Sequence, residues 1–135
     1  MMNERSDPID VAEVAVFLRA FAEERDWGQF HSPKNLAMAL AGEAGELLEI
    51  FQWLTPEESS ALPNDPKKRA RLEDELADIV QYAIRLADEA GINLNAALWS
   101  KLEANSDRFT CTHESNHGPL RECPDARPPG DIRAR

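Results

Sequence analysis

Residues 32–54 read SPKNLAMALAGEAGELLEIFQWL, and this stretch decides the fold. Ser32 and Pro33 form a helix start signal, because serine caps the first turn and proline favours the first helical position. Large apolar side chains then recur within roughly 60° of one another, at about 100° per residue. They are Leu36, Leu40, Leu47, Phe51 and Leu54. The pattern predicts a long helix that ends near Trp53 and buries this stripe.

Glu43 lies inside that apolar stripe, about 20° from its centre, and Glu46 follows three residues later on the same side of the helix. A buried carboxylate without a partner costs several kcal/mol or takes up a proton. Glu43 therefore needs a partner that a solvated helix face would not require.

A second pair of carboxylates, Glu75 and Asp78, lies in residues 65–91, which read DPKKRARLEDELADIVQYAIRLADEAG. Asp65 and Pro66 repeat the cap-and-proline signal, and Gly91 is a typical helix stop. The expected apolar stripe of this helix contains Leu72, Leu76, Ile79, Ala83, Leu86 and Ala90. Both acidic residues flank the stripe, so the two helices can place their carboxylate pairs along one seam.

Four carboxylates brought together in this way require a cation. Two ionised carboxylates about 5 Å apart repel by roughly 3 kcal/mol at an effective dielectric of 20. Oxygen ligands without His or Cys favour Mg²⁺ or Mn²⁺ over Zn²⁺. The alternative, that acidic residues line a solvated helix face, fits the other acidic positions. Those positions are Glu49, Glu57, Glu58, Glu73 and Asp74.

Two more helices are expected, over residues 7–25 and about 94–109, and no segment shows sustained strand alternation. Residues 55–64 contain two prolines and no periodicity, so they read as a connecting loop. The predicted fold is all-α, a four-helix antiparallel bundle over residues 1–109. Residues 110–135 have few large apolar side chains and are expected to be a disordered tail.

The net charge of −10 lies in the first 109 residues, because the last 26 carry four acidic and four basic side chains. An acidic domain repels nucleic-acid backbone, which excludes polymeric DNA or RNA as an expected partner but leaves a small phosphate ester with its metal. The N-terminus has no apolar signal segment and the chain has no long uncharged apolar run. We therefore expect a soluble, cytoplasmic protein without a membrane partner.

The two cysteines, Cys111 and Cys123, fall in the expected tail, so the core does not depend on a disulfide. With His113 and His117 they suggest a zinc site only weakly, since the spacing matches no common structural zinc motif.

The two carboxylate pairs and their surroundings resemble the MazG-like all-α nucleoside triphosphate pyrophosphohydrolases, most closely the dCTP pyrophosphatase branch. The resemblance covers roughly residues 14–109. It is carried by Glu24-Arg25-Asp26-Trp27, Phe30-His31, Pro33, Asn35-Leu36, Gly42-Glu43, Gly45-Glu46-Leu47, Phe51-Gln52-Trp53 and Glu75-x-x-Asp78. A bare pair of acidic motifs is a weak signal, whereas the combination with both tryptophans is specific.

The resemblance implies hydrolysis of a nucleoside triphosphate to the monophosphate and pyrophosphate. It implies that Mg²⁺ is held by Glu43, Glu46, Glu75 and Asp78. Either Glu43 or Glu46 would orient or deprotonate the attacking water, and the sequence does not choose between them.

Flat indoles stack well on nucleobases, so Trp27 and Trp53 suit a base pocket, although both could equally be core aromatics. The resemblance favours binding and places Tyr82 at the border of the substrate pocket. His31, just before the 32–54 helix, is a further substrate-binding candidate, with a plain surface residue as its alternative.

Lys101, Asn105 and Arg108 recur at helical spacing in an otherwise acidic domain. They resemble the family segment that contacts the phosphate chain, and cations there would balance a polyanionic substrate. The alternative is an exposed basic side of the last helix. Leu18 departs from vertebrate members of the branch, which carry a histidine there, so base preference is left open.

The leading hypothesis is a Mg²⁺-dependent pyrophosphohydrolase for dCTP or a modified pyrimidine nucleotide, in nucleotide-pool house-cleaning. One alternative keeps the fold but changes the substrate to dUTP or another triphosphate. Another is a non-catalytic helical interaction module whose acidic face binds a basic protein. Helices this apolar, together with the resemblance, imply a homo-oligomer, either a tetramer or a dimer. The number of metal ions and the role of the tail stay open.

Overall fold

The computed structural model describes residues 8–108, and all regular elements within them are helical. In chain order they are α1 (Val11–Glu24), η1 (Trp27–Phe30), α2 (Pro33–Phe51), α3 (Pro56–Ala61), η2 (Leu62–Asn64), α4 (Pro66–Glu89) and α5 (Leu94–Arg108), where η marks a 3₁₀-helix. The chain forms two compact units that divide between Asn95 and Ala96. The all-α prediction is confirmed.

The helix caps predicted at Ser32 and Asp65 form at the starts of α2 and α4. The Ser32 hydroxyl accepts a hydrogen bond from the Asn35 N–H at 3.2 Å. The Asp65 carboxylate accepts from Lys67 N–H at 2.9 Å and from Lys68 N–H at 3.3 Å. Each cap satisfies amide groups that have no partner inside the helix. After α4, Gly91 takes the left-handed backbone conformation, with φ +66°, that only glycine adopts without strain.

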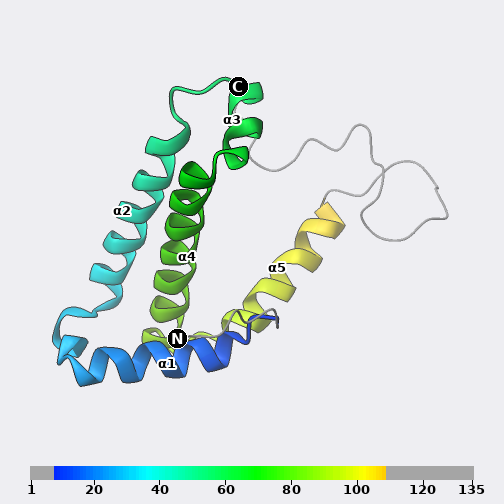
Figure 1. The fold of residues 1–135 in the computed structure, drawn as a ribbon. Coiled ribbons are helices and arrows are strands. Elements are labelled where there is room, and N and C mark those ends of the chain that lie inside the picture. Colours follow the sequence, from blue (N-terminus) through cyan, green and yellow to red (C-terminus); the bar gives the residue numbers. More distant parts are fainter. Residues whose placement is uncertain (1–7, 109–135) are drawn as a thin grey trace. The chain divides into compact units, whose positions relative to one another are not determined.

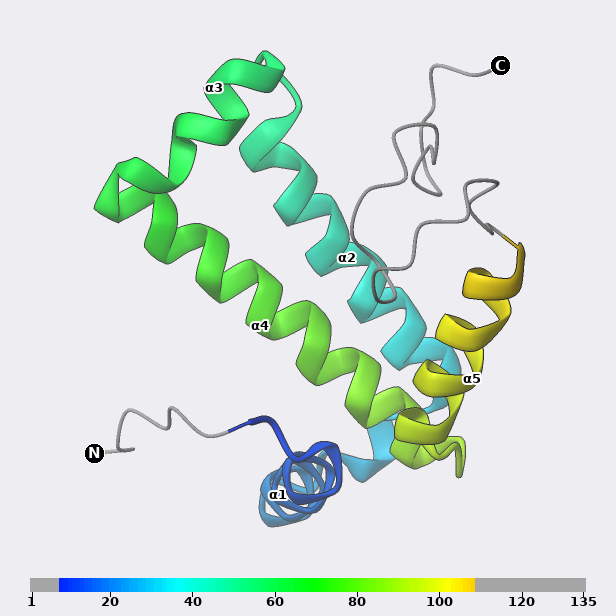
Figure 2. The same ribbon diagram turned by 90° about the vertical axis from the view of Figure 1, so that its right-hand side faces the viewer.

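Helices α2 and α4 lie side by side and antiparallel, and α3 and η2 connect their ends (Figures 1 and 2). Helix α1 runs across this pair where α2 begins and α4 ends, and it packs on α4. The most buried residues are Leu36 of α2, Ala22 of α1 and Ile84 of α4, which are 1%, 2% and 3% exposed. The core of this unit therefore lies where the three helices meet.

Three local predictions were wrong. The segment expected to be a loop contains α3, because Thr55 and Glu58 form a reciprocal capping box over a short helix. The first helix starts later than expected: Asp10, and not Asp7, is its cap, since Asp10 accepts from Ala12 N–H at 2.9 Å. Leu76 lies 47% exposed although the apolar stripe placed it in the core.

Helix α5 spans the boundary between the two units and carries Lys101, Asn105 and Arg108. Asn105 is half-buried, whereas Lys101 and Arg108 are exposed. The predicted tail from residue 110, with Cys111, His113, His117 and Cys123, lies outside the described residues. No helix within residues 8–108 is long and apolar enough to cross a membrane.

Candidate functional site

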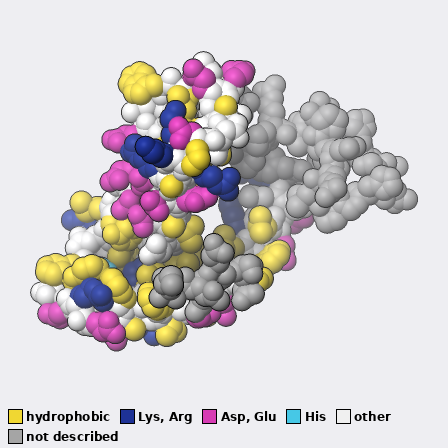
Figure 3. All heavy atoms as spheres, in the orientation of Figure 1, with side chains coloured by type: hydrophobic (Ala, Val, Ile, Leu, Met, Phe, Trp, Pro, Cys, Tyr) yellow, Lys and Arg dark blue, Asp and Glu magenta, His cyan; other side chains and the backbone are white. Residues whose placement is uncertain are grey.

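The carboxylates of Glu43, Glu75 and Asp78 converge where α2 faces α4. One oxygen of each lies within 4.8 Å of those of the other two. Glu75 is 8% exposed and Glu43 is half-buried. Figure 3 shows acidic side chains gathered over the middle of the α2–α4 pair. The structure thus brings together three of the four expected ligands from two helices.

Glu46, the fourth expected ligand, is exposed and is not part of this group. It still acts on the site electrostatically. Burial raises the pKa of Glu43, and the negative charges of Glu46, Asp78 and Glu75 raise it further, in that order. The Glu43 carboxylate is therefore disfavoured as an anion unless a positive charge is supplied.

One positive charge beside the group comes from Arg71. Its guanidinium lies 3.7 Å from the Glu75 carboxylate and 3.7 Å from that of Glu49, so it bridges α4 to α2. Both contacts are long for ion pairs, and the Arg71 side chain is 54% exposed. Arg71 moderates the charge of the group without occupying its centre.

The donor set suits a hard divalent cation. Its ligands are carboxylate oxygens, their spacing permits one ion to contact all three, and their mutual repulsion is relieved when an ion binds. The described residues place neither His nor Cys in this group. The acid group fits the predicted metal site.

A cavity of about 130 Å³ adjoins the acid group. Its lining residues are Leu18, Phe21, Ala22, Trp27, His31, Asp78, Gln81, Tyr82 and Arg85. Asp78 belongs both to this wall and to the acid group. A molecule bound in the cavity therefore lies directly beside the candidate metal site. The volume is below the roughly 300 Å³ of ordinary drug-sized pockets, so it suits one small ring.

The aromatic wall of the cavity is built by the turn between α1 and α2. The Trp27 ring meets Phe21 edge-on at 5.7 Å between centroids and lies 6.1 Å from the His31 ring. The Arg25 guanidinium covers Phe21 at 3.4 Å from the ring centroid. Asp26, with φ +54°, gives the chain the left-handed turn that precedes Trp27.

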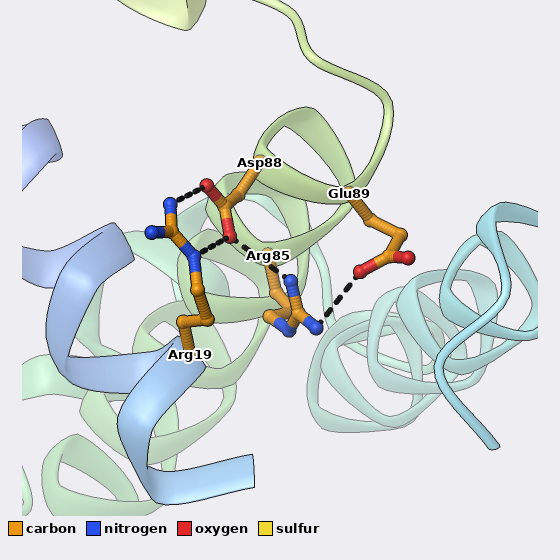
Figure 4. A network of polar contacts seen from close by, with 4 residues as sticks. All are labelled: Arg19, Arg85, Asp88 and Glu89. Atoms are coloured by element: carbon orange, nitrogen blue, oxygen red, sulfur yellow. Dashed lines mark hydrogen bonds and ion pairs between the residues drawn. The ribbon is translucent and has the colours of Figure 1, made fainter. Parts of the chain in front are cut away.

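Behind the cavity, two arginines share one carboxylate (Figure 4). Arg85 Nη1 donates to Asp88 at 3.0 Å, and Arg85 Nη2 pairs with Glu89 at 2.9 Å. Arg19 reaches Asp88 from α1 through both Nε and Nη2, and its Nε donates at 3.0 Å. The network fixes Arg85 and ties α1 to the end of α4 that forms the cavity.

Among the described residues, Arg85 Nε and His31 Nδ1 of the cavity wall are buried without a hydrogen-bond partner. A buried donor left without an acceptor costs about 1–3 kcal/mol. Burial lowers the pKa of His31, and the positive charge of Arg85 lowers it further, so the imidazole is neutral at pH 7. Buried polar atoms of this kind call for a partner such as a water, an ion or a ligand.

Of the expected substrate contacts, the cavity brings together Trp27, His31 and Tyr82. Trp53 lies just after α2, is 86% exposed and does not line the cavity. Gln81 and Arg85 escaped the sequence reasoning. They follow Asp78 at helical spacing, three and seven residues on, and that spacing was the signal that could have found them.

The sequence agrees with this fold and site: residues 39–117 match the model of the MazG-like family. The match covers more than half of the chain, and the protein belongs to the MazG-like family.

Particular relatives agree with that membership. The chain is similar to dCTP pyrophosphatase 1 of Rattus norvegicus and of Homo sapiens, with 46% identity in each case over 89 residues, 66% of this chain and 52% of the relative. It thus spans about half the length of these curated relatives. It also resembles the crystal structure of a pyrophosphatase from Archaeoglobus fulgidus, with a TM-score of 0.69 and 33% identity, covering 80% of this chain and 99% of that one.

The carboxylate of Asp88, which Arg19 and Arg85 share, makes the stability of the fold depend on pH. The hydrogen bond from Arg19 holds the pKa of Asp88 below its ordinary value. Ionised Asp88 therefore stabilises the fold above its unfolded pKa, and this stability is lost as the pH falls through the folded pKa. Because Arg19 is half-exposed, we expect Asp88→Asn to lower the free energy of unfolding by about 1–2 kcal/mol at pH 7.

Urea unfolding at pH 7, 5 and 3.5 checks this, and the difference from wild type should shrink below about pH 4. Glu73→Gln is the matched control, because Glu73 pairs with Arg69 on the open surface of α4, where both side chains are 62% exposed. A constant difference across the pH range would contradict the role given to ionised Asp88.

Proposed function

We propose that the protein is a Mg²⁺-dependent pyrophosphohydrolase that cleaves dCTP or a modified pyrimidine deoxynucleoside triphosphate to the monophosphate and pyrophosphate. The observation that carries the proposal is Asp78, which belongs both to the acid group and to the wall of the adjoining cavity. A nucleotide with its base in the cavity would extend its phosphates toward the carboxylates. The similarity to dCTP pyrophosphatase 1 of two mammals supports the substrate class.

Glu43, Glu75 and Asp78 would hold the metal, with Glu46 at the edge of the group. A bound divalent ion neutralises phosphate charge and stabilises the leaving pyrophosphate. The three carboxylates fix where the triphosphate lies relative to the cavity, and this positioning lowers the entropic cost of the reaction. Mn²⁺ satisfies the same oxygen ligands.

Glu46 is the carboxylate free to act as a base. It lies near enough to Glu43 to affect its pKa but stands outside the group of converging oxygens. In the proposed reaction, a Glu46 oxygen accepts a proton from water, the water oxygen bonds to the α-phosphorus, and the bond to the bridging oxygen of pyrophosphate breaks. Glu43 then acts chiefly as a metal ligand.

The base would occupy the cavity against Trp27, with His31 and Tyr82 in its walls. Apolar and aromatic walls suit stacking on a pyrimidine ring. Contacts of Lys101, Asn105 and Arg108 with the phosphate chain stay predictions, as does a role for Trp53.

Self-association belongs to the proposal because many large hydrophobic side chains of the described residues are exposed. The exposed large hydrophobic side chains of α1, α2 and α4 include Val16, Phe17, Met38, Leu48, Leu76 and Val80, each at least 44% exposed. Figure 3 shows hydrophobic side chains open to the surface over α1. Burial of such side chains between copies of the chain would stabilise a dimer or tetramer.

Hydrolysis and metal binding together should distinguish the roles of Glu43 and Glu46 in α2. With dCTP and Mg²⁺, wild type should release pyrophosphate, and Glu43→Gln and Glu46→Gln should each lower kcat by at least about a hundredfold. Glu46→Gln should still respond to Mg²⁺ in thermal unfolding, whereas Glu43→Gln should not. Glu57→Gln on α3 is the control. A panel of dCTP, dUTP and other triphosphates tests the substrate, and no turnover on any of them would reject the proposal.

Metal affinity should rise when Arg71 is neutralised. A positive charge about 4 Å from a ligand opposes a cation by about 1 kcal/mol in water, so Arg71→Gln should tighten Mg²⁺ binding roughly fivefold. Isothermal titration with Mg²⁺ measures this. Arg69→Gln removes the same charge from an exposed pair on the same helix and should change nothing. Weaker binding in Arg71→Gln would show that Arg71 instead orients Glu75.

Oligomeric state follows from the apolar surface. Size-exclusion chromatography with light scattering should give a mass about two or four times that of the 15.1 kDa chain. A species of one chain across the micromolar range would contradict self-association.

A further inference from the structure

The polar side chains of the cavity differ in whether they can distinguish a hydrogen-bond donor from an acceptor on a ligand. Gln81, Tyr82 and neutral His31 can each donate or accept a hydrogen bond, so they adapt to either edge of a ligand. Asp78 accepts but belongs to the acid group. The side chains that only donate are Trp27, which is 42% exposed, and Arg85, which is 7% exposed. Arg85 is thus a buried residue of the wall that can only donate hydrogen bonds.

Arg85 is also the wall group whose position is most firmly fixed. Its Nη1 and Nη2 are engaged by Asp88 at 3.0 Å and by Glu89 at 2.9 Å, and Arg19 holds Asp88 from the other side (Figure 4). Its Nε is buried and has no acceptor among the described residues. A guanidinium held in this way has one nitrogen without a partner, and its two paired nitrogens limit how far it can turn.

We propose that Arg85 is a specificity-determining residue that donates a hydrogen bond to N3 of the base and thereby selects cytosine over uracil and thymine. The inference rests on the proposed function, because it takes the cavity to hold the base of a pyrimidine nucleotide. Asp88, Glu89 and Arg19 are positioning residues for Arg85.

The selection follows from the protonation of the base. In cytosine, N3 carries no hydrogen and accepts a hydrogen bond, so it can meet the N–H of Arg85. In uracil and thymine, N3 carries a hydrogen, which would oppose the N–H of Arg85 and leave two buried donors facing each other. Groups attached at C5 lie away from this edge, so Arg85 would also accept cytosines modified at C5.

Because Nε is buried, a ligand can reach it only if the side chain shifts slightly while it keeps its ion pairs with Asp88 and Glu89. Rotamer changes of this size are common on binding. The acceptor that Arg85 lacks is then supplied by the ligand, and the buried donor becomes satisfied.

The test compares kcat/KM for dCTP and dUTP in wild type, Arg85→Lys and Arg85→Gln. Lysine keeps the charge between Asp88 and Glu89 but lacks the fork of donors, so it guards against a simple folding defect. We expect wild type to prefer dCTP and both variants to lower the dCTP-to-dUTP ratio by at least about tenfold. Arg69→Gln, on the same helix but away from the cavity, should keep the wild-type ratio.

A second arm measures binding without hydrolysis, by isothermal titration of dCMP, dUMP and the 2-pyrimidinone deoxyribonucleoside monophosphate in Mg²⁺. The 2-pyrimidinone base keeps O2 and the N3 acceptor but lacks the 4-amino group. We expect it to bind wild type about as well as dCMP, and both to bind better than dUMP. Both Arg85 variants should lose this order.

The results separate the two proposals. Hydrolysis of dCTP with an unchanged dCTP-to-dUTP ratio in folded Arg85 variants would overturn the role of Arg85 and leave the proposed function standing. Selective binding that depends on Arg85, in a protein that cleaves no triphosphate, would support Arg85 and reject the hydrolysis. The inference would be overturned if the wild type bound dCMP and dUMP equally, or bound neither. It would also be overturned if the wild type bound the 2-pyrimidinone nucleotide as weakly as dUMP.

Discussion

The repulsion among Glu43, Glu75 and Asp78 is the constraint on which the rest of the site depends. Packing of α2 against α4 brings one oxygen of each carboxylate within 4.8 Å of the others. Burial raises the pKa of Glu43, and the neighbouring negative charges raise it further. A core that served only stability would avoid such an arrangement. The helices can carry it because Leu36 and the residues around it hold the pair together and Arg71 offsets part of the charge. The acid group is an arrangement of mutually repelling charges that a cation would relieve.

The second organising feature is the shared carboxylate of Asp88. It joins Arg19 of α1 to Arg85 of α4, at the end of the helix pair where the cavity lies. Helix α1 thereby closes the cavity with Leu18 and Phe21 while the acid group stays accessible from it through Asp78. Asp78 of the acid group and Arg85 of the cavity wall thus lie on one helix, about two turns apart.

Much of this could be predicted from the sequence, for physical reasons. Helix caps and stops depend on residues that are neighbours in the sequence. The starts of α2 and α4, at Ser32 and Asp65, and the end of α4, at Gly91, could therefore be predicted. The convergence of Glu43, Glu75 and Asp78 followed from helical spacing. Arg85 was not predicted, because its burial depends on Asp88 and on Arg19, which lies sixty-nine residues from Asp88 along the chain. The exposure of Leu76 and Trp53 depends on tertiary packing in the same way.

The central claim is that the seam between α2 and α4 holds a divalent ion beside the cavity. The most direct measurement is a crystal structure grown with Mn²⁺ and a nucleotide, with the ion located by its anomalous scattering. The account predicts an anomalous peak among the carboxylates of Glu43, Glu75 and Asp78, with the base in the cavity against Trp27. A structure in which the seam stays free of metal at saturating Mn²⁺, or in which the ion lies elsewhere on the chain, would contradict it.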